Sequence, residues 1–318
     1  MTVVFRSVPK LSFFAYHCTF LFLQHSLRMA IPESELILNK DGSIYHLNLI
    51  PDHISDTIIT VGDPERVATV SQHFDSIETK IHKREFVTHV GYYHGKRVTV
   101  ISSGMGTDNI DILLNELDAL VNVDLFTREA RPLEERISLR IIRVGTSGSL
   151  QPDIPVGSLL VSEHAVGLDS LMQFYPLVET GLEVDVARGV QESLQLEYRP
   201  YCVRGSDLLR EQLGAGMVVG NTLTCPGFYG PQGRVLRLDL RMPDLIEKFQ
   251  QFRHHSAEGE FRLTNFEMET AGYYALGRML GHDVVPLNAI VANRATGEFA
   301  TNSEAIINDL IATTLSRL

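Results

Sequence analysis

The segment SLRIIRVGTSGSL, residues 138–150, decides the fold class of this chain of 318 residues. Its first half, Ser138 to Gly145, is largely apolar and is typical of a buried strand in a parallel sheet. Its second half, GTSGS, is rich in glycine, and we interpret it as a turn that follows the strand. A buried strand that ends in such a turn indicates an α/β protein.

Strands and helices alternate on both sides of this segment. Residues 57–61 are predicted to be a short strand before a Gly-Asp-Pro helix start, and residues 86–102 a hairpin. Residues 107–120 have the apolar spacing of an amphipathic helix. Further strands are predicted around residues 159, 218 and 284, with helices at 268–281 and 303–318. We therefore predict an α/β fold, with one domain over residues 37–318 whose central mixed β-sheet is flanked by helices.

Composition excludes some classes of partner. The chain has 28 basic and 39 acidic residues, a net charge of −11, which argues against nucleic acid as a main partner. The three cysteines, Cys18, Cys202 and Cys225, form no CxxC motif and suggest no disulfide framework. The 12 histidines include no HExxH motif, so we expect no metal site. The expected location is the cytoplasm.

Residues 1–36 are predicted to be an N-terminal extension that is poorly ordered or starts before the native methionine. The run LSFFAYHCTFLFL, residues 11–23, is too short to span a bilayer comfortably, and no membrane association is expected. The core of a signal peptide is the alternative reading, but no small-residue cleavage site follows the run. The sequence from Met29 onward is more typical of the start of a soluble protein. We therefore favour the choice of an upstream start codon over secretion as the explanation of the extension.

Ligands of open α/β sheets bind where strands end, and charged residues follow several predicted strands here. Arg66, Arg143 and the GTSGS segment offer guanidinium groups and free N–H groups to an anion. Glu269 is placed to accept bonds from sugar hydroxyls, although it equally suits the start of a helix. Each feature alone is ordinary loop chemistry.

The segment CPGFYGPQGR, residues 225–234, is too rich in glycine and proline for a helix or a central strand. Alone, it is best interpreted as a surface turn. Its side chains also suit a planar ligand, because an aromatic ring stacks, an amide both donates and accepts, and an arginine donates twice. Anion, sugar and planar base together are the three parts of a nucleoside phosphorolysis.

From about His46 onward the chain resembles the nucleoside phosphorylases of the uridine phosphorylase type. The stretches that carry the resemblance occur in the same order along the chain and cover some 270 residues: YHLNL, VGDPERV, KREF, SSGMG, RVGTSGSL, FYGPQGR, FEMET and NR. One such stretch would be weak support, and the ordered set is strong.

The resemblance implies a phosphate site made of Gly62, Arg66, Arg84, Arg143 and Thr146. Arg84 would reach the phosphate of a neighbouring subunit, so the active enzyme would be a homo-oligomer with shared active sites. Inorganic phosphate would be a co-substrate, and no cofactor is expected.

The resemblance also implies ribose and base sites. The ribose residues would be His46 from the neighbouring subunit together with Met268 and Glu269. The base would contact Phe228, Gln232 and Arg234, with Arg294 behind it. The residues that would carry the catalysis are Arg66, Arg143, Arg234 and Glu269.

The function implied is phosphate-dependent, reversible cleavage of the N-glycosidic bond of a pyrimidine nucleoside, by a pentosyltransferase of nucleoside salvage. Uridine and phosphate would give uracil and ribose 1-phosphate. Purine-specific relatives place an aspartate where this chain has Asn293, and they lack the Gln/Arg pair. The alternatives are a purine nucleoside phosphorylase or nucleosidase of the same fold, or a non-catalytic nucleoside-binding protein.

Overall fold

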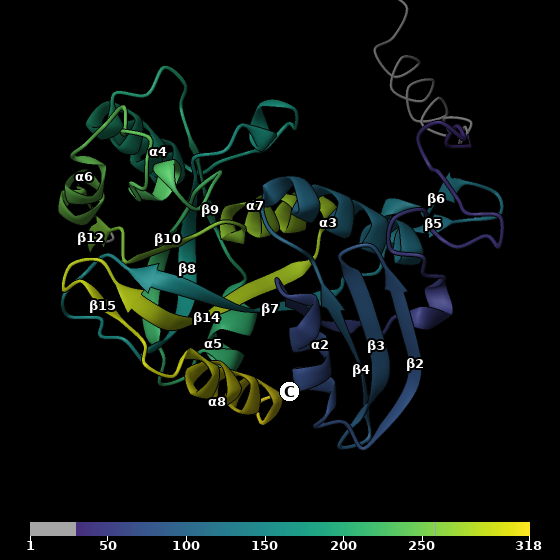
Figure 1. Ribbon diagram of the computed structural model, residues 1–318. Helices are drawn as coiled ribbons and strands as arrows, with labels where there is room; N and C mark the ends of the chain where they lie inside the picture. The colour runs from purple at the N-terminus through teal and green to yellow at the C-terminus, as the bar shows by residue number, and fades with distance from the viewer. Residues whose placement is uncertain (1–29, 258) are drawn as a thin grey trace, which may run out of the picture.

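Strand β7 (Arg140–Ser149), formed by the opening segment, lies in the middle of a mixed sheet of eleven strands. The computed structural model describes residues 30–257 and 259–318 (Figure 1). The apolar run at residues 11–23, Cys18 and most of the predicted extension lie outside the described residues. Residues 30–36 contact the domain, since Leu36 is buried and the N–H of Ile31 donates to the carbonyl of Arg128.

The sheet has the order β15-β14-β8-β10-β13-β7-β1-β4-β3-β2, with β9 paired to β8. Two small two-stranded sheets lie outside it, β5 with β6 and β11 with β12. The strand bounds besides β7 are β1 (Thr57–Val61), β2 (Ser76–Lys83), β3 (Phe86–Tyr93), β4 (Lys96–Ser102), β5 (Val123–Asp124), β6 (Glu129–Ala130), β8 (Leu159–Gly167), β9 (Tyr201–Arg204), β10 (Val218–Thr224), β11 (Arg253–Ser256), β12 (Gly259–Arg262), β13 (Asn265–Glu267), β14 (Asp283–Asn293) and β15 (Glu298–Phe299).

Helices cover the sheet in three groups, each with its own apolar cluster (Figure 1). Helices α3 and α7 pack together on one face, whereas α2, α5 and α8 cover the opposite face. Helices α4 and α6 pack at the end that carries β9 and β10. The helix bounds are α2 (Pro64–Ser71), α3 (Thr107–Asn122), α4 (Gly181–Leu194), α5 (Asp207–Leu213), α6 (Leu245–Gln251), α7 (Thr270–Leu280) and α8 (Ser303–Leu315). The predicted single α/β domain with a mixed, helix-flanked sheet is confirmed.

Strand β7 corrects one prediction, because the GTSGS segment is part of the strand and not a turn after it. Residues 145–149 pair with β14, with a register shift between Ile290 and Ala292, and residues 148–149 pair also with β13. These ladder hydrogen bonds fix an extended backbone that local glycine content alone disfavours.

Part of the sheet closes on itself, since β7, β14, β8, β10 and β13 pair in a ring. On one edge of β7, residues 140–144 pair with β1 and residues 148–149 pair with β13. Residues 145–147 therefore lie in a gap between these two neighbours. This gap positions the site described next.

Candidate active site

A cavity of about 530 Å³, here called the active-site cavity, opens where β1, β4, β7 and β14 end. Its wall combines segments that are far apart in sequence, from the loop after β1 to strand β15. The predicted site residues that line it are Gly62, Arg66, Arg143, Thr146, Phe228, Gln232, Arg234, Met268 and Glu269. The fold thus brings the predicted anion, sugar and base groups into one space.

The anion side of the cavity is built by the start of α2 and the gap in β7. Asp63 caps α2, because its carboxylate accepts from the N–H of Glu65 at 2.9 Å, and this turn carries Arg66. Burial lowers the pKa of Arg66, and the charge of Arg143 lowers it further. Two guanidinium groups on one cavity wall favour a doubly charged anion between them.

Arg143 itself is buried and contacts two carboxylates. Its Nη2 donates to Oε2 of Glu269 and lies 3.3 Å from Oε2 of Glu267. Burial disfavours the charge on Arg143, but Glu269 and Glu267 outweigh it and raise the pKa of the guanidinium. Burial, together with Glu267, raises the pKa of Glu269 to about 7, although Arg143 and the N–H of Gly106 act the other way.

The base side is formed by the loop before α6. Gln232 is only 3% exposed, and its amide oxygen accepts from Nη1 of Arg234 at 2.5 Å. The same nitrogen donates to the carbonyl of Phe228 at 2.7 Å, and the guanidinium lies 3.8 Å from the centre of the Phe228 ring. These contacts fix the amide and the guanidinium beside one aromatic face.

Arg294 lies behind this loop and does not line the cavity. Its Nη1 and Nη2 donate to the carbonyls of Gln232 at 3.1 Å and of Gly233 at 3.2 Å. These bonds brace the loop that carries Gln232. The predicted place of Arg294 behind the base stays a prediction.

Arg84 and His46 are also outside the cavity of their own chain. Arg84 occupies the turn between β2 and β3 with φ of 55°, and its guanidinium lies 5.6 Å from the ring of Tyr45. His46 pairs through Nδ1 with Glu116 at 2.6 Å. The predicted role of both residues in a neighbouring subunit stays a prediction.

Several residues of the cavity wall were not predicted from the sequence. Glu267 was not predicted, although it precedes Met268 and Glu269 in the FEMET stretch, because its contact with Arg143 joins two distant parts of the chain. Phe299 lines the mouth and is 71% exposed, but no pattern around it distinguishes it from a surface residue.

The family model that matches the chain is described as the phosphorylase superfamily, and it covers residues 56–316. The chain belongs to the phosphorylase superfamily. A uridine phosphorylase of Thermococcus kodakarensis is 30% identical over 267 residues, which is 83% of each chain. The predicted resemblance, and with it an enzyme of the pentosyltransferase class, is confirmed.

Other phosphorylases are similar as well. A DeoD-type purine nucleoside phosphorylase of a Thermoanaerobacter species is 26% identical over 81% of this chain and 91% of its own length. The crystal structure of a Trypanosoma brucei nucleoside phosphorylase, reported with uridine phosphorylase activity, matches with a TM-score of 0.81. It is 29% identical, and the match covers 89% of this chain and 100% of that one. Relatives of both base preferences therefore share this fold.

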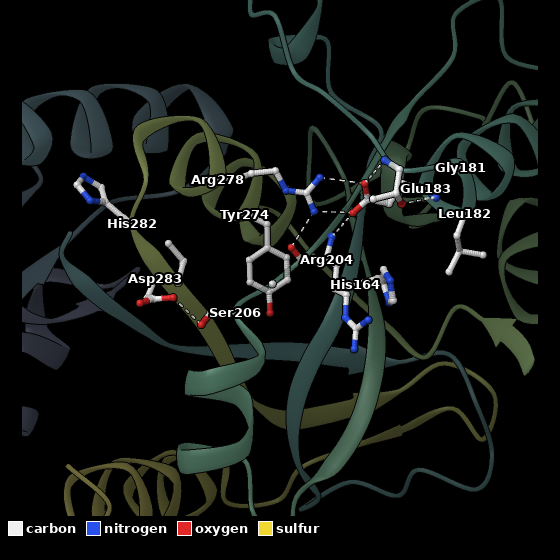
Figure 2. A pocket seen from close by; sticks show the side chains of 13 residues that line it. His164, Gly181, Leu182, Glu183, Arg204, Ser206, Tyr274, Arg278, His282 and Asp283 are labelled. Carbon is white, nitrogen blue, oxygen red and sulfur yellow. Dashed lines mark hydrogen bonds and ion pairs between the residues drawn. The ribbon is translucent and has the colours of Figure 1, made fainter. Parts of the chain in front are cut away.

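Figure 2 shows a second hollow, of about 470 Å³, between the start of α4, the end of α7 and the start of β14. Its main charges are paired with each other, since Arg278 donates to both carboxylate oxygens of Glu183 at 2.6 and 2.9 Å. Ser206 likewise donates to Asp283 at 2.7 Å. None of the predicted site residues lines this hollow.

Within residues 30–257 and 259–318, no group of three or more His, Cys, Asp or Glu side chains is arranged to hold a metal ion. Over the same residues, no helix combines the length and the apolar character that crossing a membrane requires. Cys202 and Cys225 are buried free thiols.

Proposed function

We propose that this phosphorylase cleaves pyrimidine nucleosides with phosphate, and that uridine gives uracil and ribose 1-phosphate. The observation that carries the proposal is the paired Gln232 and Arg234 beside the Phe228 ring. Uracil presents a carbonyl, an N–H and a second carbonyl along one edge. An amide oxygen accepts two hydrogen bonds, so Gln232 can keep its bond from Arg234 and accept from the base N–H as well.

The chemistry of the step agrees with these groups. A phosphate oxygen attacks C1′, the bond from C1′ to the base nitrogen breaks, and its electron pair passes into the base ring. The negative charge then spreads to the two ring carbonyls, where Gln232 and Arg234 donate hydrogen bonds. Positioned donors of this kind stabilise the departing base without a dedicated acid.

The sugar and the phosphate would occupy the other two sides of the cavity. Glu269 and Met268 line the cavity and would hold the ribose, since a carboxylate accepts bonds from vicinal hydroxyls. Arg66, Arg143 and Thr146 would hold the phosphate against C1′, with Gly62 allowing close approach. Arg84 would complete this site from a neighbouring subunit, as His46 would complete the ribose site.

Asn293 argues against the purine alternative. A purine leaving group needs a proton at N7, and a side chain that supplied it would have to face the cavity. Asn293 is 1% exposed and donates to the carbonyls of Gln151 and Ile154, each at 3.0 Å. Its amide oxygen accepts from the N–H groups of Ala295 and Thr296. Every polar atom of this side chain is therefore bonded to the backbone of the β7–β8 and β14–β15 connections.

A substrate panel tests the proposal. We expect the purified protein to release base from uridine only when phosphate is present, and to act more weakly on inosine. Release from inosine exceeding that from uridine would favour the purine alternative, which the DeoD-type relatives keep open. Release that does not depend on phosphate would indicate a nucleosidase, and no release from any nucleoside would indicate a binding protein.

A further inference from the structure

Arg143, a predicted phosphate ligand, contacts two carboxylates of its own chain. Its Nη2 donates to Glu269 and approaches Glu267 at 3.3 Å, and its side chain is only 5% exposed. Glu269 is in turn the predicted ribose ligand. The predicted anchors of the two substrates are thus paired with each other.

The two carboxylates differ in how firmly the chain holds them. Glu267 accepts from the hydroxyl of Thr224 at 2.8 Å and from the N–H groups of Glu269 and Thr270 at 3.0 Å. Three donors from its own surroundings fix this carboxylate in place. It remains beside Arg143 whatever the cavity contains.

Glu269 has fewer partners. Its Oε1 accepts from the N–H of Gly106 at 2.8 Å, and its Oε2 depends on Arg143. Both Glu269 and Arg143 line the active-site cavity, so a ligand that enters it reaches both groups. The contact between them is therefore the one that an entering anion can exchange.

We propose that the Glu269 carboxylate stands in for phosphate at Arg143 in the empty site, and that phosphate releases it to the sugar hydroxyls. The inference rests on the proposed function for the second half of this exchange. A phosphate oxyanion offers Arg143 the same hydrogen-bond acceptor as a carboxylate and adds a second charge for Arg66. Glu267 keeps one side of the guanidinium neutralised throughout.

The exchange couples the two substrates. Before phosphate binds, the sugar must separate Glu269 from Arg143, and after phosphate binds, that separation has already occurred. Phosphate therefore strengthens nucleoside binding, and by thermodynamic reciprocity the nucleoside strengthens phosphate binding by the same factor.

The first test measures the binding of inorganic phosphate alone by calorimetry. We expect Glu269→Gln to bind phosphate about fivefold or more tightly than the wild type, the lower end of ordinary coupling between sites. Glu85→Gln is the matched control, because Glu85 is another carboxylate on the cavity wall. We expect this control to change phosphate affinity by less than about twofold.

An equal increase in phosphate affinity in the two variants would show that losing any negative charge on the cavity wall has this effect. That result would overturn the proposal. Unchanged or weaker phosphate binding by Glu269→Gln would overturn it as well. This binding measurement needs neither turnover nor a nucleoside. Its result therefore tests the exchange even if the proposed base specificity is wrong.

The second test uses only the wild type and therefore does not depend on whether a variant folds. Uridine is titrated with and without inorganic sulfate, a doubly charged anion that takes the place of phosphate without reacting. We expect sulfate to tighten uridine binding by about fivefold or more. Unchanged or weaker binding in sulfate would contradict the exchange, whereas an absence of uridine binding in both samples would count against the proposed function.

Discussion

At the residue scale, the proposed function depends on which side chains share the active-site cavity. Four residues of its wall were predictable from their place in the sequence: Arg66, Arg143, Gln232 and Glu269. Arg143 belongs to a predicted buried strand next to the GTSGS segment, Arg66 and Glu269 follow strands, and Gln232 lies in a loop of unusual composition. Glu267 was not predictable, since its importance comes from lying 3.3 Å from a guanidinium whose residue is more than one hundred positions away in sequence. Contacts of this kind follow from strand order, which one sequence does not reveal.

Arg234 provides the first prediction at this scale. We expect Arg234→Ala to reduce turnover of uridine by about 10²–10³, the usual effect of removing one donor to a developing anion. The measurement is kcat for phosphorolysis at saturating phosphate. Arg237→Ala is the control, because Arg237 is an exposed arginine of the same loop and does not line the cavity. Equal losses in both variants would contradict the role of Arg234.

Glu269 provides a pH prediction. Burial raises its pKa to about 7 from the ordinary value of 4.5, so the folded protein keeps this proton to higher pH than the unfolded chain. The stabilising contribution of the protonated form is therefore present below about 4.5 and is lost as the pH rises to about 7. Glu269→Gln cannot titrate, so we expect the wild type to lose up to about 3 kcal/mol relative to this variant across that window.

Urea unfolding of both proteins at a series of pH values measures this difference. The charged neighbours of this carboxylate, Arg143 and Glu267, are present in both proteins. A difference in unfolding free energy that is constant between pH 4.5 and 7, or that grows in favour of the wild type, would contradict the raised pKa.

At the element scale, the strands and helices with strong periodicity were predictable to within a few residues. Strand β1 (Thr57–Val61) and helix α3 (Thr107–Asn122) follow directly from β-branched composition and apolar spacing. The end of β7 was predicted wrongly, because GTSGS has the composition of a turn. Pairing with β14 and β13 overrides that local preference, and both partners lie more than one hundred residues further along the chain.

The glycine at the start of this segment gives a prediction for β7. A Cβ at Gly145 would lie 1.8 Å from Nη1 of Arg143, so the guanidinium occupies the space that a side chain would need. We expect Gly145→Ala to displace Arg143 and raise KM for phosphate by about tenfold or more, with a smaller effect on KM for uridine.

Steady-state kinetics with each substrate varied in turn measure this difference. Gly181→Ala is the matched control, because a Cβ there meets no atom within 4 Å. Unchanged KM for phosphate in Gly145→Ala, with folding intact, would show that Arg143 does not depend on this close approach.

At the scale of the whole molecule, the sequence predicted one α/β domain but not the closed ring of β7, β14, β8, β10 and β13. Ring closure depends on the antiparallel pairing of β13 with β7, which involves only two register pairs. This pairing leaves the gap in β7 that the anion side of the cavity uses. A pairing this short produces no periodic pattern in the sequence, so it could not be predicted from the sequence.

The predicted oligomer gives a test at the same scale. Arg84 and Arg143 would serve one active site from two different subunits, so we expect Arg84→Ala and Arg143→Ala each to be nearly inactive alone. Mixing the two variants under conditions that exchange subunits would then restore part of the activity, since some hybrid sites receive both native arginines. Sedimentation measures the assembly in parallel, and an active monomer, or a mixture no more active than its parts, would contradict shared sites.

The central claim is that arginine side chains present inorganic phosphate to C1′ while Gln232 and Arg234 receive the departing pyrimidine. Phosphorus NMR of the purified protein with uridine and phosphate tests it most directly, because it identifies the nucleophile from the product. The account predicts ribose 1-phosphate in an amount equal to the uracil released. Uracil accompanied by free ribose, or no uracil at all, would contradict it.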